Sequence, residues 1–117
     1  MPEEGPSVEP QSLAKHFNEA LILSSLERGP KHGYQLALDI EEGSEGRFGF
    51  KHGTLYPLLH KLEGDDLIRG EWTDEGPRGK RKQYRLTPRG QQYLGTLRDS
   101  WRTLLQRFTN LMGEGKS

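Results

Sequence analysis

Cysteine is absent from the 117 residues of this chain. Its absence excludes disulfides, thiolate catalysis and zinc-thiolate sites together, and it fits a reducing cytoplasm. Long apolar runs are absent as well. The longest strongly apolar segment is ALILSSL, whereas a helix that crosses a bilayer needs roughly 20 such residues. A transmembrane role is therefore excluded.

Apolar residues are also scarce. They make up 31% of the chain, against 29% charged residues, so we expect one domain with a modest core, which favours burial against a second copy. Residues 1–11 hold three prolines and three glutamates. Without the apolar segment of a signal peptide, they are predicted to form a disordered lead, and residues 113–117 a flexible tail.

Arrangements typical of enzymes are missing. His60 and Glu63 stand three residues apart, but no third ligand at suitable spacing accompanies them, so a solvent-exposed pair is expected rather than a metal site. The segment GSEGRFG lacks the lysine of a phosphate-binding P-loop. We expect no enzyme, no cofactor and no metal.

A net charge is absent too, but the zero formal charge hides an asymmetry. Residues 1–50 carry four basic and nine acidic side chains, whereas residues 51–90 carry nine basic and six acidic ones. Residues 76–89 hold six cations and no anion. Such a block can bind phosphate locally although the whole molecule has no long-range attraction to it.

Local patterns predict helices over residues 12–28 and 34–42. The second has Tyr34, Ala37 and Leu38 on its apolar stripe and Ile40 near the edge of that stripe. A third helix follows from the spacing of Leu55, Leu58, Leu59 and Leu62. Pro57 complicates its start: either Thr54 caps it, or it begins near Lys51 with a local distortion, which we favour. Residues 67–73 and 81–87 alternate as strands, with Ile68, Trp72, Tyr84 and Leu86 inward, and DEGPRGK between them supplies a hairpin loop.

The last helix opens with Thr87 as cap and Pro88 as first residue. Apolar residues then alternate steps of three and four, as in a short heptad seam that packs on a partner helix. The predicted dimer interface is Leu94, Leu97, Trp101, Leu104, Leu105 and Phe108. For Trp101 an alternative is open, in which it and its symmetry mate flank a cleft for a flat aromatic or hydrophobic compound.

The element order is helix, helix, helix, hairpin and long helix. It predicts a mainly α (α+β) winged-helix fold: a winged helix-turn-helix domain over residues 12–87, then a dimerisation helix over residues 88–112. The third helix would be the recognition helix, and the two-stranded hairpin the wing.

Three segments, HGYQLALDIEE, GTLYPLLHKLEGDDLI and GKRKQYRLTPRG, resemble in order and spacing the signature of the PadR family of bacterial transcriptional regulators. LGTLRDSWRTLLQRF resembles the C-terminal helix of the branch with a short C-terminal helix. The resemblance implies a cytoplasmic homodimer that binds DNA, usually as a repressor, often released from its operator by a small molecule. This chain departs from the family in EGDDLI, where the family has EEDGLI, so Asp66 is expected in the left-handed conformation.

Two groups of residues are the candidate DNA contacts. On pattern alone, a solvated helix face and a solvated charge run explain them as well, and Tyr56 could either donate its hydroxyl to a phosphate or close the core. The resemblance favours DNA. In the recognition helix they are Lys51, His52, Thr54, Tyr56, Pro57 and Lys61, and in the wing Arg78, Lys80, Arg81 and Lys82. The alternative function is a winged-helix module that binds a protein through the same face, which salt dependence would distinguish.

Overall fold

The computed structural model describes residues 8, 10–74 and 79–113 and forms the predicted mainly α winged helix. Its helices are α1 (Leu13–Glu27), α2 (Gly33–Gly43), α3 (His52–Gly64) and α4 (Pro88–Leu111), preceded by a 3-10 turn at Pro10–Ser12. Three strands, β1 (Lys31–His32), β2 (Ile68–Asp74) and β3 (Lys80–Leu86), form an antiparallel sheet in the order β1-β3-β2. The predicted lead and tail lie almost wholly outside the described residues, but Val8 is largely buried.

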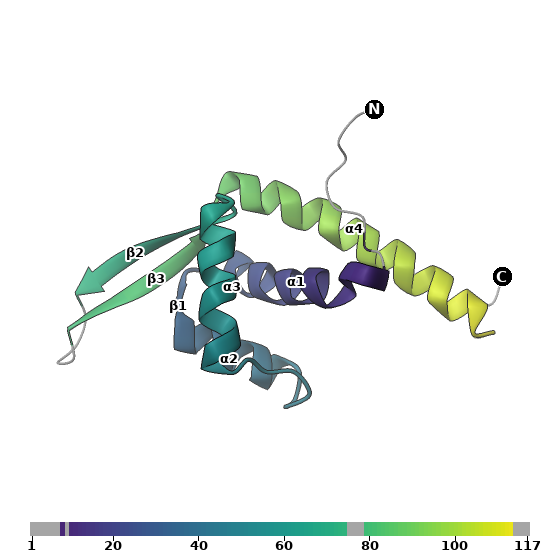
Figure 1. Cartoon of the computed structure of the whole chain (residues 1–117), viewed down its shortest axis with the longest axis horizontal. Coiled ribbons are helices and arrows are strands. Elements are labelled where there is room, and N and C mark those ends of the chain that lie inside the picture. The colour runs from purple at the N-terminus through teal and green to yellow at the C-terminus, as the bar shows by residue number, and fades with distance from the viewer. Residues whose placement is uncertain (1–7, 9, 75–78, 114–117) are drawn as a thin grey trace.

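The core lies where α1, α2, α3 and the start of α4 meet the base of the sheet. Ile22, Leu23 and Leu26 of α1 contribute to it. They pack with Leu36, Ile40, Leu55, Leu59, Leu62, Leu67, Ile68, Tyr84 and Leu94. As Figure 1 shows, the wing projects from one end of this core and α4 continues beyond the other.

The buried face of α2 differs from the predicted one. Leu36 and Ile40 are its buried apolar side chains, whereas Tyr34 and Leu38 are 50% and 45% exposed. Ala37 packs against the core as predicted. The prediction was wrong for Tyr34 and Leu38, because an 11-residue helix with apolar residues on several sides has two possible stripes. Packing against α1 and α3 selects the stripe that Leu36 and Ile40 share.

The predicted recognition helix is α3. It begins at His52, with Lys51 at its cap, which confirms the earlier of the two predicted starts. The Lys51 carbonyl accepts from the amides of Thr54 and Leu55, both at 2.9 Å, and Pro57 lies inside the helix. At the other end Asp66 has φ +64°, and the Leu67 amide donates to the Leu62 carbonyl at 3.0 Å. The left-handed Asp66 is thus confirmed; it takes the place that glycine usually has after a helix.

The sheet contains one strand that the sequence did not predict. Lys31 and His32 of β1 pair with Tyr84 and Gln83 of β3, and β3 pairs along its length with β2. Ile68 and Tyr84 face the core as predicted. Trp72 lies on the same side of β2, but the hairpin extends past the core, so its side chain is 66% exposed.

The start of α4 is as predicted. The Thr87 hydroxyl accepts from the Gly90 amide at 2.9 Å, and Pro88 occupies the first turn. The placement of Leu94 and Leu97 departs from the predicted seam, because both side chains have 0% exposure within their own chain. The heptad pattern indicated an apolar face, but α1 of the same chain covers its first half.

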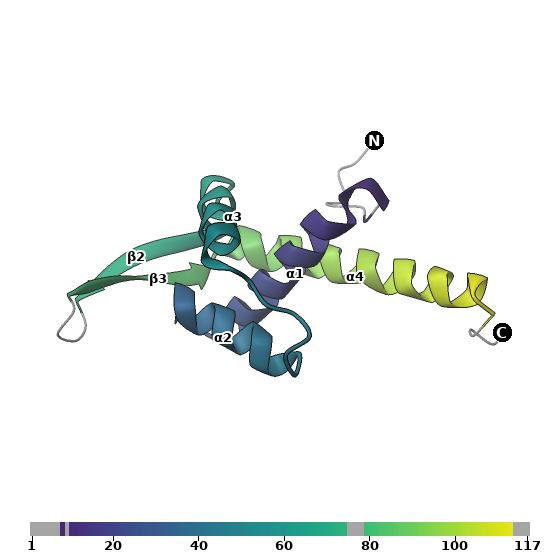
Figure 2. The same cartoon turned by 60° about the horizontal axis from the view of Figure 1, so that its bottom comes forward.

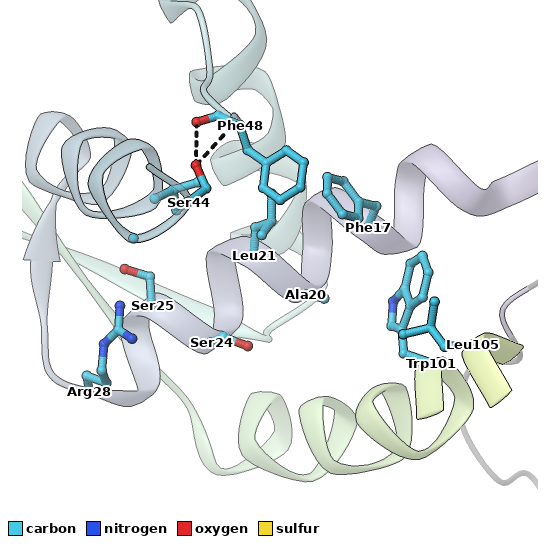
Figure 3. Close-up of a pocket in the computed structure, with 12 residues that line it drawn as sticks. Phe17, Ala20, Leu21, Ser24, Ser25, Arg28, Ser44, Phe48, Trp101 and Leu105 are labelled. Carbon is cyan, nitrogen blue, oxygen red and sulfur yellow. Dashed lines mark hydrogen bonds between the residues drawn. The ribbon is translucent and has the colours of Figure 1, made fainter. Parts of the chain in front are cut away.

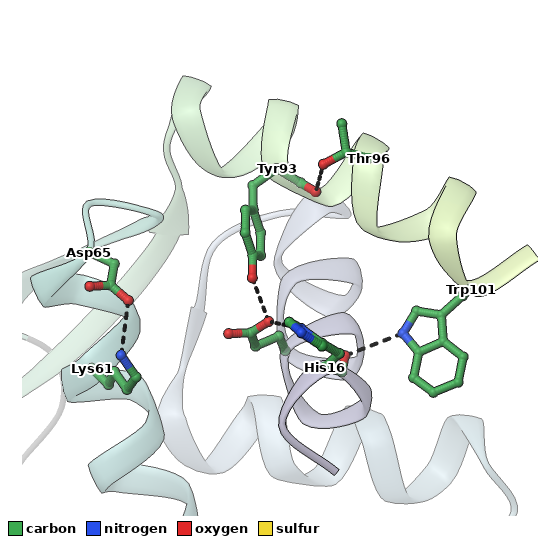
Figure 4. A network of polar contacts seen from close by, with 7 residues as sticks. His16, Lys61, Asp65, Tyr93, Thr96 and Trp101 are labelled. Carbon is green, nitrogen blue, oxygen red and sulfur yellow. Dashed lines mark hydrogen bonds and ion pairs between the residues drawn. The ribbon is translucent and has the colours of Figure 1, made fainter. Parts of the chain in front are cut away.

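Polar contacts fix the direction in which α4 leaves the core (Figure 4). The buried Glu19 carboxylate accepts from Tyr93 Oη at 2.7 Å and lies 3.0 Å from His16 Nδ1, while Trp101 Nε1 donates to the His16 carbonyl at 3.4 Å. Burial, and then the hydrogen bond to Glu19, raise the pKa of Tyr93. Arg98 pairs with Glu27 at 2.6 Å, and this hydrogen bond lowers the pKa of the Glu27 carboxyl.

The half of α4 that follows these contacts projects beyond the other elements (Figure 2). Among the described helices, none is both long and apolar enough to cross a membrane.

Candidate nucleic-acid interface

The exposed face of α3 carries most of the predicted recognition residues. Leu55, Leu59 and Leu62 are buried. This orientation leaves Lys51, Thr54, Pro57 and Lys61 exposed. Among the described residues, the ion-pair partner of Lys61 is Asp65, one turn on, at 3.3 Å. Both side chains are exposed, so this pair restrains Lys61 little. The His52 side chain lies outside what the structure describes.

Tyr56 links the recognition helix to the start of α2. A Cβ on Gly33 would stand 2.6 Å from Tyr56 Oη and 2.8 Å from its Cε1, so the ring lies directly against this glycine. Nevertheless, 40% of Tyr56 is exposed. The Tyr56 phenol therefore lies between the first residue of α2 and the N-terminal half of α3.

The three described cations of the wing have different surroundings. Lys80 is exposed, and none of the described side chains pairs with it. The Arg81 guanidinium lies 5.4 Å from the centroid of the Tyr34 ring. Lys82 Nζ contacts Glu63 Oε1 of α3 at 3.0 Å and lies 5.7 Å from the ring centroids of both Trp72 and Tyr84. Arg78 lies outside the described residues.

Between α2, α3 and the wing lies a hollow of about 420 Å³. It is lined by His32, Gly33, Tyr34, Tyr56, Trp72, Arg81, Lys82 and Tyr84. Burial raises the pKa of Tyr84, so its phenol stays protonated at neutral pH. Sequence reasoning missed Tyr34 and Trp72 here because it counted both as core residues; the HGY segment beside a predicted helix start was the available signal for Tyr34.

A second cavity, of about 480 Å³, lies between α1, the end of α2 and α4, beside Trp101. In Figure 3 the Phe17 ring stands between Phe48 and Trp101. Its centroid is 4.8 Å from that of Phe48 and 6.0 Å from that of Trp101, both edge to face. Leu21 and Leu105 add to the wall. Trp101 was predicted for the dimer interface or an effector site. In the structure it packs against Phe17 of its own chain.

The remaining predicted interface residues lie on the projecting half of α4. Leu105 and Phe108 are 54% and 57% exposed, and Leu104 is half-buried. With Leu111 and Met112, which are 88% and 60% exposed, they form what we call the C-terminal apolar face of α4. The described chain leaves most of this face exposed.

Two helices joined by a loop, the second with its outer face exposed beside a cationic hairpin, define a winged helix-turn-helix protein of the kind that regulates transcription. Comparison with known proteins agrees. The model of the transcriptional regulator PadR-like family matches residues 22–96.

A PadR family transcriptional regulator from Eggerthella lenta has a similar structure, with a TM-score of 0.75 and 31% identity over 87% of each chain. An uncharacterized protein from Lysinibacillus sphaericus is 31% identical over 71% of this chain and 76% of its own length. Bacillus subtilis PadR, solved in complex with operator DNA, aligns with a TM-score of 0.62 and 30% identity over 68% of this chain and 44% of its own. The chain belongs to the PadR-like family, whose members are transcriptional regulators and not enzymes.

Proposed function

We propose that this protein is a homodimeric, DNA-binding transcriptional repressor. The observation that carries the proposal is the exposed face of α3, with Lys51, Thr54 and Lys61, beside the cations of the wing. This juxtaposition suits a helix in the major groove with a hairpin on the adjacent backbone. Bacillus subtilis PadR supports it, since that protein is a negative transcriptional regulator and was solved with operator DNA. A regulator acts where the chromosome is, so we place the protein in the cytoplasm.

The residues divide between positioning and readout. Lys80 and Arg81 contact phosphates, because long, flexible, charged side chains on the wing suit positioning on the DNA backbone rather than readout of base edges. We assign the groove contacts to residues of α3, with His52 included on sequence alone: Lys51, His52, Thr54, Tyr56, Pro57 and Lys61. Residues 12–87 act as the DNA-binding domain and residues 88–112 as the dimerisation helix, although the first turns of α4 belong to the core. Arg78 is assigned to the wing with Lys80 on sequence alone.

Replacing Lys80 and Arg81 by alanine should weaken binding to every DNA sequence. The log-log salt dependence should become shallower by about 0.9 for each phosphate that the wing ceases to neutralise. Genomic fragments captured by the purified protein would supply the DNA, and affinity would be measured by fluorescence anisotropy from about 50 to 200 mM salt.

Lys15→Ala is the matched control, since Lys15 is an exposed cation in the first turn of α1, which lies away from the wing (Figure 1). An unchanged slope in the Lys80→Ala, Arg81→Ala variant would remove the wing from the interface. Absence of salt-dependent binding in the unmodified protein would favour a protein-binding module instead. Transcription in vitro from a promoter that carries the captured fragment should fall when the protein is added, and a rise would mean activation.

We also propose that the cavity beside Trp101 binds a small aromatic or hydrophobic effector. Its walls are mainly apolar and include two phenylalanines and a tryptophan, the composition typical of ligand pockets. It adjoins the C-terminal apolar face of α4 through Leu105. A ligand there would change how two copies are oriented, and with it the separation of their recognition helices.

Trp101→Ala should abolish binding of anilinonaphthalene sulfonate, a planar apolar probe, measured by the rise in dye fluorescence. Trp72→Ala is the control, because it removes an exposed tryptophan on the wing without touching the cavity. Far-UV circular dichroism would check that both variants stay folded. If dye binding is lost only in Trp72→Ala, the effector site is not beside Trp101.

A further inference from the structure

Glu63 is the one carboxylate among the described residues that joins the recognition helix to the wing. Its Oε1 accepts from Lys82 Nζ of β3 at 3.0 Å, and its Oε2 from the Gly70 amide of β2 at 3.2 Å. One side chain of α3 thus contacts both strands. The carboxylate and the ammonium are each 28% exposed, so water screens this pair less than the exposed pairs on the same surface.

The backbone of β2 is shaped for this contact. β2 forms an edge of the sheet, and its Gly70 amide donates to Glu63 rather than to another strand. A Cβ on Gly70 would stand 2.4 Å from Lys82 Cε and 3.2 Å from Glu63 Oε2. The absence of a side chain at Gly70 therefore lets the Lys82 stem cross the strand and reach the carboxylate.

Lys82 is further held by aromatic rings. Its ammonium lies 5.7 Å from the ring centroids of Trp72, its cross-strand neighbour, and Tyr84. Lys82 therefore has an anion and two aromatic faces as partners, whereas Lys80, two residues away, has no ion-pair partner among the described residues. Two lysines of the same basic segment therefore have different electrostatic surroundings.

We propose that Glu63 is a positioning residue that fixes the position of the wing relative to the recognition helix. Lys82 pairs with Glu63 in this role and does not bind a DNA phosphate. The inference rests on the proposed DNA-binding function and deepens it. Because the Glu63–Lys82 pair holds the wing at one distance from α3 in the free protein, less conformational entropy is lost when DNA binds. Moving Lys82 to a phosphate would leave Glu63 as a partly buried, unpaired anion close to DNA.

The decisive variant is the neutral pair Glu63→Gln with Lys82→Gln, which keeps the net charge and can keep an amide-to-amide hydrogen bond. Its salt slope for a captured genomic fragment should equal that of the unmodified protein. The matched control is Asp74→Asn with Lys80→Gln, an oppositely charged cross-strand pair one step further out on the wing. There the slope should become shallower by about 0.9 for each phosphate left without its cation. An equal decrease in both variants would make Lys82 a phosphate ligand and overturn the proposal.

A second measurement needs no DNA. In Glu63→Ala the Gly70 amide should exchange with solvent at least about tenfold faster by NMR, as expected for losing a hydrogen bond to a charged group. Glu63→Gln should restore most of the protection, and Glu71→Ala, which removes a carboxylate from the exposed Arg85 pair on the same strand, should leave it unchanged. Unchanged exchange in Glu63→Ala would contradict the positioning contact. If the Gly70 exchange rates follow this expectation but the unmodified protein shows no salt-dependent DNA binding, the proposed function is contradicted and the positioning contact is not.

Discussion

Replacing Gly90 by alanine should lower the free energy of unfolding by about 3 kcal/mol, the upper end of what overpacking a core costs. Gly90 is the third residue of α4, and a Cβ there would stand 2.0 Å from the Leu67 carbonyl oxygen and 2.9 Å from Leu86 Cδ1. The nearest obstacle is backbone, which cannot rotate away as a side chain can. The same carbonyl accepts from the Thr87 amide at 3.2 Å, so a displacement would also disturb the helix cap.

Gly95 provides the control within the same helix. Nothing lies within 4 Å of a Cβ placed on it, so Gly95→Ala should stabilise the protein by about 0.5–1 kcal/mol through helix propensity. Urea unfolding at one fixed protein concentration would measure both variants, since stability of a dimer depends on concentration. Equal and small effects for the two glycines would mean that α4 does not approach Leu67 as closely as described.

Features determined by neighbours in sequence were predictable. The leucine stripe of α3, the Thr87-Pro88 start of α4 and the left-handed Asp66 each follow from residues within one or two helical turns. For the start of α3 the local sequence offered two choices, and the structure has the earlier one, with Lys51 at the cap.

Features determined by distant residues were not predictable. β1 consists of two residues whose pairing with Tyr84 and Gln83 depends on the folded sheet. Glu63 and Lys82 are 19 positions apart, and no periodicity relates a helix residue to a strand residue. From the sequence, Lys80, Arg81 and Lys82 were therefore indistinguishable as wing cations, whereas in the structure the side chains around them differ.

An apolar pattern also does not reveal what covers it. Leu94, Leu97, Trp101, Leu104 and Phe108 follow one heptad spacing, yet the first two are buried within their own chain and Phe108 is exposed. The boundary falls near Trp101, which contacts His16 at the start of α1. The structure thus narrows the proposed pairing surface to the C-terminal apolar face of α4, with Trp101 at its edge.

Changing Leu105 and Phe108 together to aspartate should therefore convert the protein to monomers that bind the captured DNA roughly 10²–10⁴-fold more weakly, because the second half-site contact ceases to be intramolecular. Both side chains are more than half exposed in the single chain, so the monomer should stay folded with unchanged helix content. The corresponding change at Leu97 would be uninformative, since a charge at a fully buried position unfolds the domain itself.

Thr103→Asp with Gln106→Asp is the matched control: two exposed positions at the same spacing, on the opposite side of the same helical segment. It adds the same charge to α4 but should leave both mass and DNA affinity close to those of the unmodified protein. Sedimentation velocity would give the mass, and anisotropy the affinity. A dimer that survives Leu105→Asp with Phe108→Asp would place the pairing surface elsewhere. A folded monomer that retains full affinity would instead show that one recognition helix and one wing suffice for binding.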